Sequence, residues 1–199
     1  MLGTAGQLFH DWSADYRLYS APRVNPEALF APVRHVLTGK LAAGQPLVAA
    51  LDDTRLRKRG RTIPGVQYVR DPLGPPFHVN FIRAQRFVQL SMAVPMATGA
   101  ARMVPLDFVH APAAPKPPAT ADAATQARYR QAQRDRALPA VGADRLHRLR
   151  HHLDTEGHRA RPLWTVVDGG YTNRRFLKAL PSHTVAIGRI RADAKLHHL

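Results

Sequence analysis

Two short apolar segments, each followed at once by aspartate, restrict the fold of this chain more than any other feature. Residues 46–51 read PLVAAL and lead into Asp52 and Asp53, while residues 162–167 read PLWTVV and lead into Asp168. Short apolar runs that end in polar residues are typical of buried strands. We therefore predict two buried strands that present carboxylates at their carboxyl ends.

Helix and loop signals lie on either side of the first of these strands. Asn25 and Pro26 predict the start of a helix, because asparagine caps helix amino termini and proline fits the first turn. Residues 1–45 are expected to be mostly helical. Residues 55–76 are basic and rich in glycine and proline, which predicts a loop with one short strand at 66–69.

Strand patterns return in the middle of the chain. Residues 77–96 and 102–109 carry alternating or apolar stretches on either side of a glycine, which predicts a β-hairpin. Pro105 lacks a backbone N–H and therefore favours an edge position or a bulge for the second strand. Residues 111–120, APAAPKPPAT, form a proline-rich linker without a packing pattern.

The last part of the chain alternates helix and strand. Residues 121–157 predict a basic helix that Pro139 divides in two. Residues 174–180 predict a short helix capped by Asn173, and residues 183–190 predict a final strand.

This order predicts an α/β protein with an RNase H-like fold, β-β-β-α-β-α-β, that is incomplete at its carboxyl end. A helical segment at 1–45 precedes this domain at 46–199. In such a fold the first and fourth strands lie side by side, so the carboxylates at their ends meet. Trp164, on the fourth strand, is expected to pack in the core.

The charge of the chain indicates its partners. Lys and Arg number 29 against 14 Asp and Glu, a net charge of +15, and 24 of the cations are arginine. Such an excess attracts polyanions, with nucleic acid as the first candidate and an anionic membrane surface as the second. No uncharged apolar run is long enough to predict a membrane-spanning helix, and the absence of cysteine excludes disulfides and cysteine-ligated metals.

Aspartates at neighbouring strand ends suit divalent metal ions. Mg²⁺ prefers oxygen ligands, which carboxylates and phosphate oxygens supply. Two such ions about 3.5–4 Å apart stabilise the attacking and leaving oxygens of a phosphodiester displacement. Charge and acid placement together indicate metal-dependent cleavage or strand transfer of nucleic acid. A carboxylate at a strand end is also commonly a turn residue, and that interpretation stays open.

Four stretches of the chain carry a family resemblance: LVAALDDTRLRKRG, FVQLSMAVP, LWTVVDGGYTNRRFLKALP and AIGRIRADAKL. In this order, over residues 5–199, they resemble bacterial insertion-sequence transposases of the DDE superfamily of endonucleases. The resemblance implies metal-dependent DNA cleavage and strand transfer, with Mg²⁺ or Mn²⁺ as cofactor. It implies DNA as partner (transposon ends and target), a bacterial cytoplasmic location at the nucleoid and no membrane association, and it leaves a homo-oligomer open.

The resemblance also assigns the acids. Related transposases use the aspartate directly before a threonine, so Asp53 is expected to be the first catalytic, metal-binding residue, with Asp52 as an alternative or supporting ligand. Asp168 matches the second. The third carboxylate of the family is a glutamate beyond the last strand, but no glutamate follows Asp168, and Asp193 lies too close to that strand. We therefore expect a C-terminally truncated domain with weakened metal binding and catalysis and with apolar surface left exposed.

Basic residues close to the acids are candidates for binding DNA phosphates, because arginine forms bidentate contacts with phosphate. The group after the first strand comprises Arg55, Arg57, Lys58, Arg59 and Arg61. The group after Asp168 comprises Arg174 and Arg175. Solvated basic loops have the same composition, so this role is a hypothesis.

Three functions remain open on sequence grounds. The first is a DDE transposase domain that cleaves and joins DNA. The second is a non-catalytic remnant that only occupies DNA. The third is a basic protein that binds RNA or another polyanion and uses its acids structurally. Whether the chain is an active enzyme depends on the missing third acid.

Overall fold

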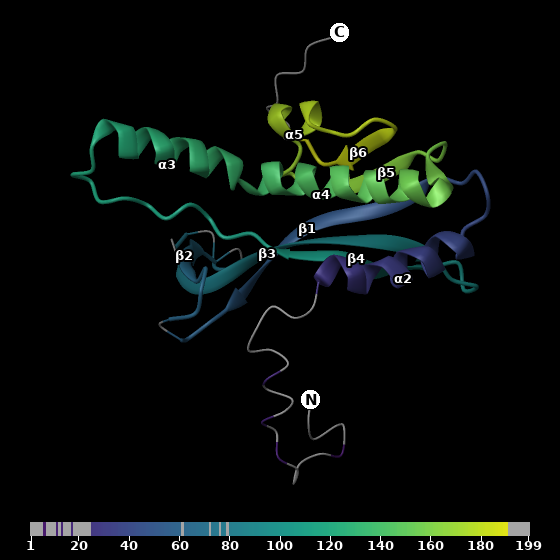
Figure 1. Ribbon diagram of the computed structural model, residues 1–199, viewed down its shortest axis with the longest axis horizontal. Coiled ribbons are helices and arrows are strands. Elements are labelled where there is room, and N and C mark those ends of the chain that lie inside the picture. Colours follow the sequence, from purple (N-terminus) through teal and green to yellow (C-terminus); the bar gives the residue numbers. More distant parts are fainter. Residues whose placement is uncertain are drawn as a thin grey trace.

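The computed structural model describes residues 25–60, 62–71, 73–75, 77–78 and 80–190, together with Gly6, Asp11, Ser13 and Arg17. It is a mixed α/β structure in which a curled sheet is covered by helices (Figure 1). In chain order its elements are α2 (Pro26–Lys40), β1 (Leu47–Arg57), β2 (Gln67–Arg70), β3 (Phe81–Pro95), β4 (Ala101–His110), α3 (Ala123–Asp135), α4 (Leu138–Leu153), the π-helical turn η1 (Asp154–His158), β5 (Leu163–Val167), α5 (Arg174–Lys178) and β6 (Thr184–Gly188).

Strand β1 lies in the middle of the sheet. It pairs antiparallel with β3 and parallel with β5, and β5 pairs parallel with β6. Strands β2 and β4 both pair with β3, each antiparallel. The two strands that lead into the aspartates are therefore neighbours, as predicted, and this mixed sheet is compatible with an RNase H-like domain.

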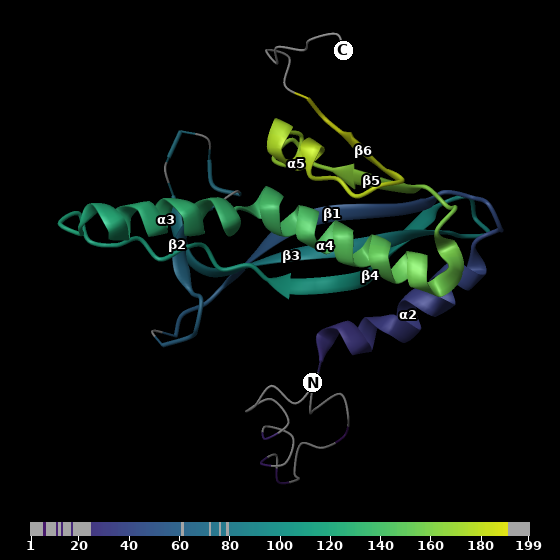
Figure 2. The same cartoon turned by 45° about the horizontal axis from the view of Figure 1, so that its top comes forward.

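Helices α2 and α4 cover one face of the sheet (Figure 2). Alternating residues of β1 (Leu47, Ala49 and Leu51) are at most 2 % exposed and form the core with Leu146 and Leu153 of α4. Leu37 of α2 belongs to the same core. The apolar spacing of each helix thus produces one buried side, which the sheet completes.

Gly142 allows α4 to lie close to the sheet. A Cβ atom added at this position would approach Leu51 Cδ2 and Tyr171 Cε1 to 2.8 Å each, which is closer than packed side chains come. Any larger residue would push the helix away from β1, so this glycine is required for the close helix–sheet contact.

No described element covers the opposite face of β5 and β6. Trp164, Val166, Val185 and Ile187 are 41–50 % exposed, whereas Leu163, between them and the helices, is fully buried. The prediction that Trp164 packs in the core is therefore wrong: strand alternation turns it away from α4.

Several predicted local features are confirmed. Asn25 accepts a hydrogen bond from the backbone N–H of Glu27 (3.0 Å) and caps α2. Strand β4 lies at an edge, and its pairing with β3 shifts next to Pro105. The basic helix divides before Pro139, which occupies the first turn of α4. Of residues 1–45, which are expected to be mostly helical, α2 occupies Pro26–Lys40, and most of residues 1–24 lie outside the described residues.

Strand boundaries differ from the predictions in two places. Strand β1 does not end at Leu51 but continues to Arg57, because the long strand β3 supplies hydrogen-bond partners as far as Ala84. Asp53 and Arg57 thus belong to a strand rather than to its end or a loop. Strand β3 begins at Phe81, later than the predicted residue 77.

Candidate active site

The parallel register of β1 and β5 brings the predicted acids together. Leu51 pairs with Val167, so Asp52 and Asp168 follow on neighbouring strands and Asp53 comes one residue later. Repulsion by Asp52 and Asp168 contributes to the raised pKa of Asp53, which places the three carboxylates within electrostatic reach of one another. These three residues are called the aspartate cluster below.

Asp53 is the buried member of the aspartate cluster. Its side chain is 13 % exposed, and its Oδ2 atom accepts no hydrogen bond; Arg55 Nη1 lies 3.4 Å from that oxygen. Burial raises the pKa of Asp53 above the ordinary value, while the charge of Arg55 opposes this shift. A buried carboxylate with a free lone pair favours the approach of a further cation.

Asp52 and Asp168 make only local hydrogen bonds. Asp52 is exposed, and its Oδ1 accepts from the N–H of Asp53 (2.8 Å). Strand alternation sends Asp52 and Asp53 to opposite faces of the sheet. Asp168 Oδ1 accepts from the N–H of Gly170 (2.9 Å), and a Cβ at Gly170 would lie 3.1 Å from that oxygen. The glycine therefore fixes the carboxylate of Asp168 in the turn after β5.

Tyr171 closes the buried side of the aspartate cluster. Its side chain is 1 % exposed, it packs edge-on against Phe176, and its hydroxyl has no hydrogen-bond partner. Burial raises the pKa of Tyr171, and the charges of Asp53 and Asp168 raise it further. Its hydroxyl therefore stays protonated and available as a donor beside the carboxylates.

Arg86 is a neighbour of the aspartate cluster that sequence reasoning missed. It pairs with Arg55 across β1 and β3, and its guanidinium donates to the carbonyls of Ala111 and Arg136 (2.8 Å each). Burial lowers the pKa of Arg86, and the charge of Asp53 opposes that shift. Alternation did carry a signal, because Arg86 falls on the same strand face as Val88 and Leu90, which are buried.

The comparison with protein families decides the identity of this fold. The family model described as DDE superfamily endonuclease matches residues 16–199.

The chain belongs to the DDE superfamily of endonucleases.

No curated protein and no solved structure matches the chain. Membership of an endonuclease superfamily implies DNA as the substrate, and the resemblance inferred from the motifs is confirmed. Within the described residues, no helix is long and apolar enough to cross a membrane.

The basic residues predicted to bind phosphate differ in their ion pairs and in their exposure. Arg55 faces Asp53, as described above, whereas Arg57 forms an ion pair with the buried Asp71 (2.6 Å) and is already engaged. Arg59 is exposed and Lys58 is half-buried. Arg61 lies outside the described residues.

The two arginines after Asp168 lie on the outer side of α5. Arg174 and Arg175 are both exposed, and Arg175 Nη2 lies 3.9 Å from Asp135 of α3. Of the predicted phosphate-binding residues, the structure therefore brings Arg55 closest to the acids.

The donor set of the DDE domain fits a metal ion that keeps most of its own water. In the part of the chain that is described, no group of three or more His, Asp or Glu side chains is arranged around one metal position. Mg²⁺, however, is commonly held by one or two carboxylates together with substrate phosphates and water. Asp53, with its oxygen free of hydrogen bonds, and Asp168 satisfy that requirement.

Proposed function

We propose that this chain is a DDE-type transposase domain that carries out metal-dependent DNA cleavage and strand transfer, at a reduced rate. The observation that carries the proposal is the parallel pairing of Leu51 with Val167, which puts Asp168 level with Asp52 and within electrostatic reach of Asp53. The strand order around β1 supports an RNase H-like fold for this domain. The family's DNA substrate fits a location at the nucleoid.

Asp53 and Asp168 are the residues that would hold Mg²⁺ or Mn²⁺. Such an ion supplies charge stabilisation for the attacking and leaving oxygens of the phosphodiester. Asp53 contributes a desolvated oxygen with no competing hydrogen bond. The Gly170 N–H orients the carboxylate of Asp168. Asp52, exposed and on the other side of the strand, is the weaker candidate ligand.

The neighbouring side chains have roles that follow from their positions. Arg55, half-buried and 3.4 Å from Asp53, orients that carboxylate and offers positive charge to a phosphate. Tyr171 excludes water from the buried side of the cluster and holds its proton. The exposed Arg59, Arg174 and Arg175 bind the DNA backbone further away.

The reduced rate follows from the number of acids that meet at this site. The family resemblance implies three carboxylates, while in the described structure no set of three ligands surrounds one metal position. Fewer carboxylates hold the ion less tightly, so a higher metal concentration should be needed.

Cleavage of supercoiled plasmid DNA tests the proposal. The purified chain, incubated with Mn²⁺ or Mg²⁺, should nick the plasmid slowly, and Asp168→Asn or Asp53→Asn should lower the rate at least about 100-fold, the scale of losing an electrostatic stabiliser of the transition state. Cleavage that survives both substitutions would contradict the proposal.

A non-catalytic nucleic-acid-binding function is the second candidate, because the net charge is +15 and α3 has no buried residue. Salt-sensitive DNA binding without any metal-dependent nicking would favour that candidate. Equal or tighter binding of RNA would point to the broader polyanion-binding function.

A further inference from the structure

A second candidate site lies beyond the end of β1, at some distance from the aspartate cluster. An open groove runs between β2, residues 112–116 and α3. Figure 1 shows the three elements that frame the groove. Helix α3 extends beyond the amino-terminal end of α4, the segment between β4 and α3 runs beneath α3, and β2 lies on the other side of that segment. Tyr68, Tyr129, Lys116 and Arg136 line this groove.

The walls of the groove are held by specific hydrogen bonds. Gln67 Nε2 donates to the carbonyl of Ala113 (2.7 Å) and ties the linker to β2. Arg86 donates to the carbonyl of Arg136, at the end of α3, and to that of Ala111, where the linker begins. The groove is therefore part of the folded domain, and Arg86 connects it to the neighbourhood of Asp53.

Gly65 shapes the floor of the groove. Its backbone has φ +70°, and a Cβ there would lie 2.2 Å from the ring of His110. Only glycine lets the loop before β2 approach the sheet so closely.

The side chains of the groove offer stacking surfaces and positive charge. The ring of Tyr68 is 72 % exposed, and the guanidinium of Arg83 lies 5.9 Å from its centroid. Lys116 and Arg136 are exposed, and none of the described residues that line the groove is acidic. Exposed aromatic rings flanked by cations are the usual means of binding single-stranded nucleic acid, in which unpaired bases stack on the rings.

On the basis of the proposed action on DNA, we propose that this groove binds a single-stranded DNA segment next to the cleaved position. The sheet register connects the two sites: Arg57 of β1, Ala84 of β3 and Gln67 of β2 lie side by side. From Asp53 to Arg57 is four residues along a strand, roughly 13 Å. A DNA strand that passes the acids thus needs only a few nucleotides to reach Tyr68.

Fluorescence anisotropy with a labelled 12-nucleotide oligothymidylate tests this site on the full chain. Tyr68→Ala should weaken binding about tenfold, whereas Tyr68→Phe, which keeps the stacking surface, should bind as wild type. Trp164→Ala, an exposed aromatic residue on β5, is the matched control and should bind unchanged. Circular dichroism and the Tm of each variant show that it is folded.

A duplex probe and an RNA probe separate stacking of single-stranded DNA from general attraction of polyanions. The affinity for a 12-base-pair duplex should fall less than twofold when Tyr68 is replaced by alanine. Three results would overturn the proposal. The first is that Tyr68→Ala leaves oligothymidylate binding unchanged, and the second is that it weakens duplex binding as much as oligothymidylate binding. The third is that the wild type binds oligouridylate more tightly than oligothymidylate.

Nicking and oligonucleotide binding distinguish the two proposals. Asp168→Asn should lower nicking at least about 100-fold, whereas Tyr68→Ala should weaken oligothymidylate binding about tenfold whether or not Asp168 is replaced. If Asp168→Asn reduces nicking but Tyr68→Ala does not change oligothymidylate binding, the groove proposal alone fails. If binding depends on Tyr68 but the wild type never nicks DNA, the proposed activity alone fails.

Discussion

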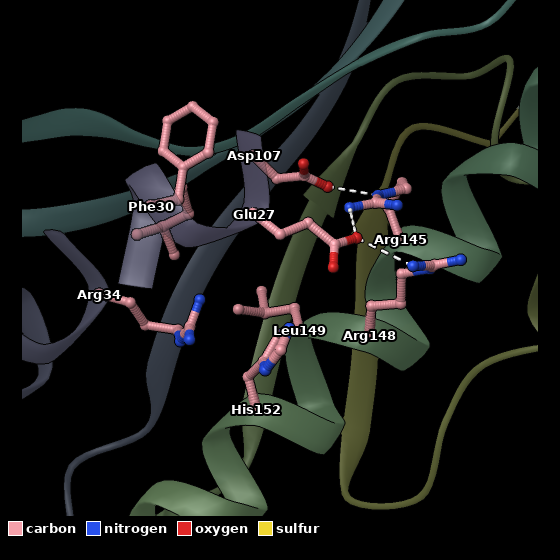
Figure 3. Close-up of a pocket in the computed structure, with 9 residues that line it drawn as sticks. Glu27, Phe30, Arg34, Asp107, Arg145, Arg148, Leu149 and His152 are labelled. Atoms are coloured by element: carbon pink, nitrogen blue, oxygen red, sulfur yellow. Dashed lines mark hydrogen bonds and ion pairs between the residues drawn. The ribbon is translucent and has the colours of Figure 1, made fainter. Parts of the chain in front are cut away.

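Two clusters of charged side chains in this molecule handle their carboxylates in opposite ways. The arginine cluster, made of Glu27, Asp107, Arg145 and Arg148, lines a small pocket between α2 and α4 (Figure 3). Arg145 donates to both Asp107 and Glu27, and Arg148 also donates to Glu27 (2.9 Å). In the aspartate cluster, Asp53 is buried and its Oδ2 accepts no hydrogen bond.

The pKa directions express this contrast. The hydrogen bond from Arg145 lowers the pKa of Glu27, and burial raises the pKa of Asp53. The first cluster has satisfied charges and joins two helices. The second holds a largely buried carboxylate whose ion pair with Arg55 (3.4 Å) leaves Oδ2 without a hydrogen bond, which is the arrangement expected where an external cation binds.

The largest expected effect on stability comes from the arginine cluster. Arg145→Met keeps the length of the side chain but leaves the carboxylate of Asp107, 15 % exposed, without its partner. We expect the free energy of unfolding to fall by about 2–3 kcal/mol, since removing one partner of a buried pair strands the other. Urea denaturation measures it.

A double variant sharpens this prediction. Asp107→Leu in the Arg145→Met background removes the stranded charge and should recover at least half of the lost stability. A double variant no more stable than the single one would show that packing, and not charge pairing, accounts for the loss.

Removing a charge from the aspartate cluster should change the free energy of unfolding in the opposite direction. Asp53→Asn removes a buried charge that the fold leaves without a hydrogen bond, so the free energy of unfolding without metal should equal or exceed that of the wild type. Asp107→Asn, which removes a satisfied charge, is the comparison and should be less stable than the wild type. A clear loss for Asp53→Asn would place Asp53 among the structural acids.

The two clusters should also respond oppositely to pH. Because the pKa of Asp53 is raised in the folded state, its charge costs the wild type stability at neutral pH, and this cost disappears as both states become protonated below about pH 4. The advantage of Asp53→Asn should therefore shrink on acidification.

Glu27 should show the reverse sign at low pH. Its pKa is lowered in the folded state, so its charge stabilises the wild type above the unfolded pKa, and this contribution is lost as pH falls through the folded value. The deficit of Glu27→Gln should be largest at neutral pH and should shrink as the pH falls through the lowered pKa of Glu27. Urea denaturation of Asp53→Asn and Glu27→Gln at several pH values checks both predictions. If the free energies of unfolding of the two variants, relative to the wild type, changed in the same direction with pH, the contrast between the two clusters would be wrong.

Sequence patterns predicted those parts of the fold that short-range rules determine. The two apolar runs before Asp52 and Asp168, the cap at Asn25 and the break before Pro139 each follow from a few adjacent residues. Strand β1 extends to Arg57 because its partner β3 is long, which no local pattern of residues 52–57 indicates.

The surroundings of the acids depend on contacts between distant segments. Arg86 reaches Ala111 and Arg136, 25 and 50 residues away. Tyr171 is buried because Gly142 lets α4 approach it. Such contacts depend on how distant segments pack, so the sequence pointed to the aspartates and Arg55 but not to Arg86 and Tyr171, which also act on their electrostatics.

The smallest effect concerns the orientation of Asp168. Gly170→Ala would place a Cβ 3.1 Å from Asp168 Oδ1 and should reduce plasmid nicking about three- to tenfold, with a Tm close to that of the wild type. Gly169→Ala is the matched control, since its Cβ would lie 3.8 Å from the nearest atom, the carbonyl oxygen of Arg189. Equal activity of both variants would remove the positioning role of Gly170.

The central claim is that Asp53 and Asp168 hold one metal ion together. Mn²⁺ binding, followed by electron paramagnetic resonance, tests it on the wild type, Asp53→Asn, Asp168→Asn and the double variant. Each single substitution should weaken binding at least about tenfold, and the double variant should bind no more weakly than the weaker single one, because a shared ion is lost only once. Unchanged binding in either single variant, or losses that add in the double variant, would contradict the claim.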